Sequence, residues 1–192
     1  MRTRTRKTPV KSHIVNIFSS TYPIVLILSL VAFVWCSQAN GQNYCLDSRF
    51  EKTVNHYLDF TVPVISVEKL RENRDQFILL DTRDREEHLV STIPGAVFWD
   101  WEITEESDLP GGISRDQPIV VFCSIGYRSE KAGEKLMEAG FTDVRNLYGS
   151  IFEWANRDYT LVDALDKPTR DLHVYNQQWS RWVTNERIRK IW

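Results

Sequence analysis

Cysteine is scarce in this sequence of 192 residues. The three that occur are Cys36, Cys45 and Cys123, and no two of them form a C-x-x-C pair. The four histidines are likewise not spaced as metal ligands. Because structural zinc sites need closely spaced clusters of Cys and His, the sequence gives no indication of one. Each cysteine therefore has to be interpreted separately.

Basic residues are also few in the body of the chain. The formal net charge is −2, yet residues 1–41 contain five Lys and Arg residues and no acidic residue. Removing those five charges from −2 leaves −7 for the remainder. Nucleic-acid binding needs basic patches that neutralise phosphates. We therefore expect no nucleic-acid partner, and any anion site must be built from local groups.

No apolar run reaches the length of an ordinary membrane-spanning helix. The longest, residues 24–34, has eleven residues, whereas a spanning helix needs about 20. A basic segment precedes this run, and small and polar residues follow it. This layout is typical of a secretory signal peptide over residues 1–41, cleaved before Gln42. An uncleaved membrane anchor and a lipid on Cys36 are alternatives. We expect export to the periplasm or another extracytoplasmic space, with membrane association if the N-terminus is retained.

Strand and helix patterns alternate from residue 63 onward. Short apolar runs predict strands at 64–65, 77–80, 96–98, 118–122 and 144–147, and the segments between them predict helices at 67–73, 85–89, 128–139 and 150–156. This order predicts an α/β domain with a parallel sheet over residues 63–163. Ligands of such sheets bind beyond the carboxyl ends of the strands, where Asp81 and Cys123 are expected.

Two segments flank the predicted domain. Residues 42–62 carry apolar side chains every four residues, which predicts a short helical lead-in. Residues 164–192 contain three tryptophans and several basic residues. Because Trp179 and Trp182 are three residues apart, we expect a C-terminal helical extension that packs both onto the domain. A basic, aromatic tail that contacts a membrane or a partner is the alternative.

The strongest predicted strand ends at Cys123, and a loop leads from it into a helix. The residues that follow are Ser124, Ile125, Gly126, Tyr127, Arg128 and Ser129. Backbone N–H groups of such a loop can converge on the sulfur, and the helix N-terminus adds partial positive charge. Both favour the thiolate, which is the nucleophilic form. Arg128 adds a planar fork of donors suited to an oxyanion, and Ser129 is a candidate helix cap. A buried cysteine with only a packing role is the simpler alternative.

Three segments resemble motifs of the rhodanese family. Residues 123–129 resemble its active-site loop C-x-x-G-x-R-[ST], residues 81–96 its D-x-R…E-[FY]…G-H-I-P-G-A segment, and residues 148–154 its G-G-x-x-x-W segment. The positions that depart from these motifs are His88, Ser91, Thr92 and Ser150. The resemblance covers about residues 64–162. It implies the rhodanese fold, a five-stranded parallel sheet with helices on both faces.

The resemblance also implies a sulfurtransferase, of the thiosulfate sulfurtransferase type. The Cys123 thiolate would take sulfur from a small anionic donor such as thiosulfate and hold it as a persulfide. The acceptor would be cyanide, a thiol or a protein. The loop residues 124–129, with Arg128 foremost, would bind the donor, and no metal or organic cofactor is needed.

Several side chains outside the loop are supporting candidates. Asp81 either orients groups of the loop or simply ends a strand as a polar residue. Arg83 either attracts the donor anion or forms an ion pair at the surface. Trp99 and Trp101 are expected to pack in the core rather than wall the site. Cys45 is a second thiol able to resolve a persulfide, although nothing in the sequence places it near the loop.

Two other functions fit parts of this pattern. Cysteine phosphatases and arsenate reductases are the first, but phosphatases of related architecture use C-x5-R, and only four residues separate Cys123 from Arg128. The shorter loop favours a sulfane sulfur over a phosphoryl group. A non-enzymatic module that keeps the fold and binds a partner is the second. The presence of Cys123, Gly126 and Arg128 together argues against it.

Overall fold

The computed structural model describes residues 44–103 and 112–192. The predicted signal peptide, residues 1–41, lies outside these ranges, so its cleavage and the export of the protein stay predictions. Within the described ranges, no helix is both long and apolar enough to cross a membrane.

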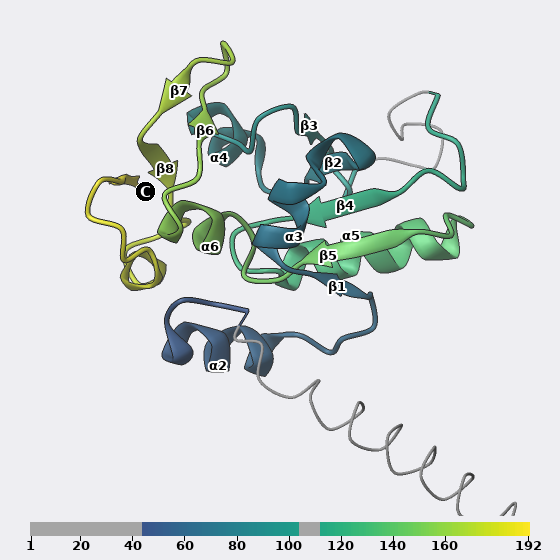
Figure 1. Ribbon diagram of the computed structural model, residues 1–192, viewed down its shortest axis with the longest axis horizontal. Helices are drawn as coiled ribbons and strands as arrows, with labels where there is room; N and C mark the ends of the chain where they lie inside the picture. The colour runs from purple at the N-terminus through teal and green to yellow at the C-terminus, as the bar shows by residue number, and fades with distance from the viewer. Residues whose placement is uncertain (1–43, 104–111) are drawn as a thin grey trace, which may run out of the picture. The chain divides into compact units, whose positions relative to one another are not determined.

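A five-stranded parallel sheet forms the centre of the described chain (Figure 1). Its strands are β1 (Val64–Ile65), β2 (Ile78–Asp81), β3 (Val97–Phe98), β4 (Ile119–Phe122) and β5 (Val144–Leu147). They lie in the order β1-β5-β4-β2-β3, and all four pairings are parallel. The central strand β4 is buried throughout, as its apolar sequence predicts. Because Asp81 pairs with Phe122, Asp81 and Cys123 lie at the same edge of the sheet.

Helices cover both faces of this sheet. They are α2 (Ser48–Tyr57), α3 (Val67–Glu72), α4 (Arg85–Val90), α5 (Tyr127–Glu138) and α6 (Ser150–Asn156), with a 3-10 helix η1 at Arg74–Gln76. Side chains of α2, α3 and α6 form the larger hydrophobic cluster with Val120 and Phe122. Side chains of α5 form the smaller cluster with Ile119 and Val121. Successive residues of β4 thus point to opposite faces of the sheet, and helices cover both faces.

The sequence-predicted elements of the domain are confirmed, each to within one residue at its ends. Ser66 caps α3, since its Oγ accepts a hydrogen bond from the Lys69 N–H at 3.2 Å. Gly140, with φ 91°, follows the end of α5. The α/β class and the five-stranded parallel sheet are likewise confirmed.

The C-terminal segment is not the predicted helical extension. Residues 161–192 form β6 (Leu161–Val162), β7 (Pro168–Thr169), β8 (Asp171–His173), the 3-10 helix η3 (Trp179–Trp182) and β9 (Arg189–Ile191). β6 pairs with β7, and β8 pairs with β9. Leu172 and Val174 are buried two residues apart, which is the period of a strand. Tyr175 then has a left-handed φ of 65°, which interrupts a helix.

The expected packing of two tryptophans is nevertheless confirmed. Trp179 and Trp182 pack against the larger cluster, and the rings of Trp182 and Phe50 lie 5.7 Å apart. Four apolar residues of the tail are themselves members of that cluster: Leu172, Val174, Val183 and Ile188. Trp192, in contrast, is exposed. The tail is therefore part of the main core, and residue 163 does not end the folding unit.

Candidate active site

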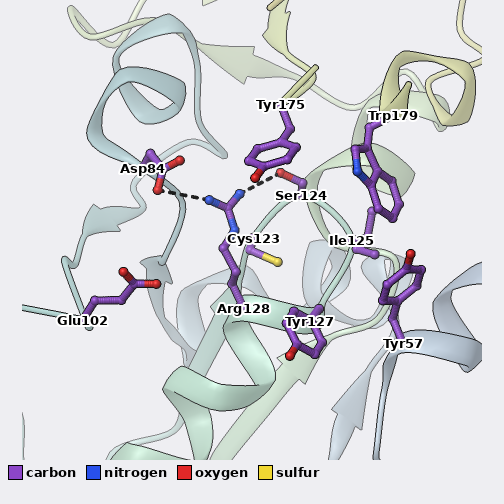
Figure 2. A pocket seen from close by; sticks show the side chains of 10 residues that line it. All are labelled: Tyr57, Asp84, Glu102, Cys123, Ser124, Ile125, Tyr127, Arg128, Tyr175 and Trp179. Atoms are coloured by element: carbon purple, nitrogen blue, oxygen red, sulfur yellow. Dashed lines mark hydrogen bonds and ion pairs between the residues drawn. The ribbon is translucent and has the colours of Figure 1, made fainter. Parts of the chain in front are cut away.

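Cys123 lies at the floor of a cavity next to the carboxyl end of β4. The cavity has a volume of about 430 Å³. It is lined by Tyr57, Asp84, Glu102, Cys123, Ser124, Ile125, Tyr127, Arg128, Tyr175 and Trp179. Only 1% of Cys123 is exposed, yet its sulfur faces the cavity (Figure 2). The structure thus brings four of the six predicted loop residues to the wall of one site, together with the cysteine.

The loop after Cys123 directs a backbone donor at the sulfur. The Gly126 N–H donates a hydrogen bond to Cys123 Sγ at 3.2 Å. Gly126 is the N-cap of α5 and has φ 121°, a conformation that L side chains rarely adopt. A glycine at this position therefore allows the amide to turn toward the sulfur.

Ser129 does not cap the helix, contrary to its predicted role, because it lies inside the first turn of α5. Its Oγ lies 2.7 Å from Asn146 Oδ1 and 3.1 Å from the Gly126 carbonyl oxygen. The Asn146 amide donates to the same carbonyl at 2.9 Å. Asn146, on the adjacent strand β5, is fully buried and was not predicted as a site residue. Together these two side chains fix the backbone on the far side of Gly126.

The N-terminus of α6 holds the other side of the loop. Ile151 and Phe152 donate their N–H groups to the carbonyls of Cys123 and Ser124, both at 3.2 Å. Ser150 Oγ accepts from the Cys123 N–H at 3.2 Å and donates to the Leu147 carbonyl at 3.0 Å. Ser150 has φ 51°, so it keeps the left-handed backbone that suits the glycine of the family motif. This departure from the motif adds a hydrogen bond to the backbone of the cysteine.

A buried carboxylate on α4 supports the loop from the side. Glu87 is 1% exposed, and its Oε1 accepts from Ser124 Oγ at 3.0 Å. Its Oε2 lies 2.7 Å from Arg128 Nη2 in an ion pair. The same Nη2 donates to Ser124 Oγ at 3.1 Å. Glu87, Ser124 and Arg128 thus form a closed hydrogen-bonded triangle beside the cysteine.

Arg128 is shared between the cavity and two carboxylates. Besides Glu87, its Nη1 pairs with Asp84 Oδ1 at 3.2 Å, and its guanidinium lies 5.5 Å from the ring centre of Tyr175. Burial disfavours the charged guanidinium, but interactions with the Cys123 sulfur and with the Glu87 and Asp84 carboxylates outweigh burial and raise the pKa of Arg128. The arginine therefore stays charged at the site, although part of its charge is balanced before any anion binds.

Asp81 and Arg83 form a buried pair below this layer. Asp81 is fully buried and accepts from Arg83 Nε and Nη2 at 2.9 and 2.7 Å. Thr92 Oγ1 donates to the same carboxylate at 2.8 Å, and His88 Nδ1 lies 3.0 Å from it. Burial alone would raise the pKa of Asp81, but the Arg83 charge and these hydrogen bonds hold it well below its ordinary value.

Arg83 thus forms the expected ion pair, but with the buried Asp81 rather than at the surface, and its side chain does not line the Cys123 cavity. The direct partners of Asp81 lie on residues 83–92 rather than on the cysteine loop. That segment carries Glu87, which contacts Ser124 and Arg128 directly. His88 and Thr92, two of the departures from the family motif, supply polar partners for this carboxylate.

The remaining candidates lie away from the cavity. Trp99 is buried in the smaller cluster and Trp101 packs against it, which confirms their expected core role. Cys45 is buried, and a β-carbon at Gly149 would lie only 3.0 Å from its Sγ. Burial and the Glu153 carboxylate raise the pKa of Cys45, which keeps this thiol protonated. Cys45 does not line the cavity, so nothing supports a resolving role.

Sequence reasoning missed several residues of the cavity wall. Tyr57, Tyr175 and Trp179 come from α2 and the tail, outside the segments that resemble a known motif. Asp84 and Glu102 belong to the connections after β2 and β3. Asp84 directly follows the D-x-R motif, and this position is the one feature of the sequence that could have indicated a residue of the cavity wall.

Comparison with known proteins identifies the domain. The Rhodanese-like domain family matches residues 66–157. The adenylyltransferase and sulfurtransferase UBA4 of Candida albicans is 29% identical over 103 residues, which are 50% of this chain and 24% of that protein. The tRNA uridine(34) hydroxylase of Cytophaga hutchinsonii is 33% identical over 91 residues, which are 45% of this chain and 28% of that protein.

Among solved structures, the human single-domain sulfurtransferase TSTD1 is 27% identical, with a TM-score of 0.45. That similarity covers 50% of this chain and 96% of the human chain. The chain spans about a quarter of the length of the two curated relatives described above. The curated relatives thus include a sulfurtransferase, and the family match covers residues 66–157. This domain of the chain belongs to the rhodanese-like family.

Proposed function

We propose that the protein is a sulfurtransferase that carries sulfane sulfur as a persulfide on Cys123. The observation that supports this most directly is the 3.2 Å hydrogen bond from the Gly126 N–H to Cys123 Sγ at the floor of an open cavity. A thiolate accepts such a bond more strongly than a thiol does, so the fixed donor favours the nucleophilic form. Sulfurtransferases among the relatives add independent support.

The reaction has two displacement steps. In the first, the Cys123 thiolate attacks the outer sulfur of thiosulfate or a similar donor. A new S–S bond forms, the S–S bond of the donor breaks, and sulfite leaves with the electron pair. In the second, cyanide, a thiol or a protein acceptor attacks the outer sulfur of the persulfide. Cys123 then leaves as the thiolate, ready for another cycle.

The charged groups at the mouth bind the donor and stabilise the leaving anion. Glu87 is buried and fixes one edge of the Arg128 guanidinium, whereas the Asp84 side chain, which also caps the start of α4, is 68% exposed. An incoming anion competes with Asp84 for the Nη1 side of Arg128, where solvent weakens the ion pair. The amides of Gly126, Tyr127 and Arg128 lie at the start of α5 and add partial positive charge.

The alternative of phosphoryl transfer fits this site less well. Only four residues separate Cys123 from Arg128, whereas phosphatases of related architecture use C-x5-R. The shorter loop leaves less room for a tetrahedral phosphoryl group than for a sulfane sulfur. A module that only binds a partner does not require a backbone N–H group hydrogen-bonded to the cysteine sulfur.

Persulfide formation tests the proposal. The full-length chain is incubated with thiosulfate, and its mass and the released sulfite are measured. We expect the mass of one added sulfur atom on Cys123 with an equal amount of sulfite. Cys123→Ser should gain nothing, while Cys45→Ser, the matched control at the other described cysteine, should behave as the parent protein. Hydrolysis of an aryl phosphate without sulfur transfer would support the phosphatase instead.

A further inference from the structure

The cavity above Cys123 has two unlike walls, and the sulfur lies between them (Figure 2). One wall is aromatic and aliphatic and consists of Tyr57, Ile125, Tyr127 and Trp179. We refer to it as the aromatic wall. The opposite wall carries the charged residues Asp84, Glu102 and Arg128, and the Tyr175 ring lies 5.5 Å from the Arg128 guanidinium. A ligand that reaches the sulfur therefore meets apolar rings on one side and ionic groups on the other.

Ring contacts hold the aromatic wall in place without a ligand. The rings of Tyr57 and Trp179 meet edge to face with centres 5.4 Å apart, and those of Tyr57 and Tyr127 with centres 6.3 Å apart. Such pairs are favourable arrangements for aromatic side chains. Tyr57 and Tyr127 are nevertheless 40% and 46% exposed. The wall is therefore preformed and still offers apolar area to a ligand.

Two of these rings do not belong to the rhodanese-like domain. Tyr57 ends α2, and Trp179 begins η3, so they precede and follow residues 66–157. Trp179 is fixed because it packs on the larger hydrophobic cluster. The flanking segments thus supply a surface beside the reactive cysteine that the domain alone does not have.

The size of the cavity exceeds the needs of an inorganic substrate. Its volume of about 430 Å³ lies within the range of sites for small organic molecules, about 300–1,000 Å³. The loop amides and Arg128 surround only the part next to the sulfur. Cyanide or sulfite would leave the aromatic wall uncovered, whereas an organic body would bury it.

The charged wall selects against additional negative charge. Asp84 and Glu102 line it, and the buried Glu87 stands directly behind Arg128. One anionic group can pair with Arg128, but the Asp84 and Glu102 carboxylates beyond that contact repel a second negative charge on the ligand.

We propose that the sulfur acceptor is a small organic thiol with an apolar aromatic or alkyl body and no second negative charge. This inference rests on the proposed function. The body of the acceptor lies on the aromatic wall, which brings its sulfur to Cys123. Its thiolate attacks the outer sulfur of the persulfide, and the S–S bond to Cys123 breaks. The electron pair stays on the Cys123 sulfur, and the acceptor leaves as its own persulfide, so no further reactant is needed.

The test compares acceptors on the preloaded full-length protein. Cys123 is loaded with thiosulfate, the excess donor is removed, and persulfide decay is followed against increasing 2-phenylethanethiol, 3-mercaptopropionate or cyanide. We expect half-saturation by 2-phenylethanethiol at about a tenfold lower concentration than by 3-mercaptopropionate. Trp179→Ala should raise the half-saturating concentration of 2-phenylethanethiol about tenfold and change the rate with cyanide less than about twofold.

Two further variants separate substrate binding from folding. Trp192→Ala removes an exposed tryptophan outside the cavity, so it is the matched control and should behave as the parent protein. Tyr57→Ala opens the aromatic wall at a side chain that is 40% exposed and not part of the core cluster. It should weaken 2-phenylethanethiol binding in the same direction as Trp179→Ala.

The outcomes distinguish this inference from the proposed function. A persulfide that passes to cyanide but shows no preference for 2-phenylethanethiol would overturn the acceptor and leave the sulfurtransferase standing. Equal slowing of cyanide and 2-phenylethanethiol in both wall variants would also overturn it. Failure to form any Cys123 persulfide, with thiosulfate or with inorganic polysulfide, would overturn the proposed function and the acceptor together.

Discussion

Glu87 and Arg128 are joined by an ion pair of 2.7 Å between Oε2 and Nη2, and this pair links α4 to the start of α5 beside the reactive cysteine. Glu87 is almost completely buried, and the guanidinium is 20% exposed. Removing one member of a buried pair leaves the other charge without compensation. The geometry of the cysteine loop therefore depends on a carboxylate that does not touch the sulfur.

Replacement of Glu87 by alanine should destabilise the protein by about 3 kcal/mol, because Arg128 and Ser124 both lose a buried partner. Urea denaturation measures this change. Sulfur transfer should also fall, since the loop loses its lateral support. Glu86→Ala, an exposed glutamate on the same helix, is the control and should stay within about 0.5 kcal/mol of the parent. Equal stabilities for the two variants would contradict the role given to Glu87.

Replacement of Asp84 by asparagine should improve the use of thiosulfate. The exposed carboxylate competes with the donor for Arg128, so its removal should lower KM for thiosulfate about threefold at low salt. The gain should shrink as ionic strength rises, because exposed charges are screened. Asp59→Asn, at an equally exposed partner of Lys131, should leave KM unchanged. An unchanged or higher KM in Asp84→Asn would show that this carboxylate does not oppose the donor.

Replacement of Gly126 by alanine should reduce the reactivity of Cys123. A residue with a β-carbon is strained at φ 121°, by about 1–3 kcal/mol, and relaxation turns the amide away from the sulfur. Loss of one hydrogen bond to a thiolate should slow alkylation of Cys123 by iodoacetamide about tenfold or more. Gly140→Ala, at φ 91° after α5, should cost comparable stability without changing the alkylation rate. Equal alkylation rates in the two variants would show that Gly126 does not influence the reactivity of Cys123.

Glu153 should make stability depend on pH near neutrality. Burial raises its pKa from 4.5 to about 7, so the folded protein holds a proton that the unfolded chain releases. The resulting contribution to the free energy of unfolding is fully present below pH 4.5 and is lost as the pH rises through about 7. Urea denaturation between these values should show falling stability in the parent protein.

The same pH series on two variants completes this test. Glu153→Gln has no titrating carboxyl and should lose most of the decline. Glu138→Gln, at an exposed position on α5, should keep it. A decline of the same size in Glu153→Gln would assign it to another group.

The cysteine loop could be predicted from sequence because its parts are contiguous. A buried strand, a cysteine, a glycine and an arginine follow one another, and each acts on its near neighbours. The sheet was predictable for a similar reason, since runs such as residues 119–122 are apolar throughout and fit only a strand buried on both faces.

The errors concern features that depend on distant residues. The sequence around Arg83 does not indicate whether the guanidinium points inward. Its partners are the Ser91 carbonyl and Asp81, and Asp81 also accepts a hydrogen bond from Thr92. The tail has short elements that are fixed by packing onto the core rather than by their own periodicity. The meeting of Tyr57 with Trp179 joins two segments far apart in the chain, and neither segment carries a motif.

The burial of the tail in the main core also determines which fragment of the chain keeps the hydrophobic cluster whole. The family match covers residues 66–157, but apolar side chains on both flanks, such as Phe50 and Val183, complete the same hydrophobic cluster. A fragment trimmed to the shared region would expose that cluster and lose one side of the reaction cavity. A fragment that keeps the whole described cluster therefore extends from about Tyr44 to the end of β9.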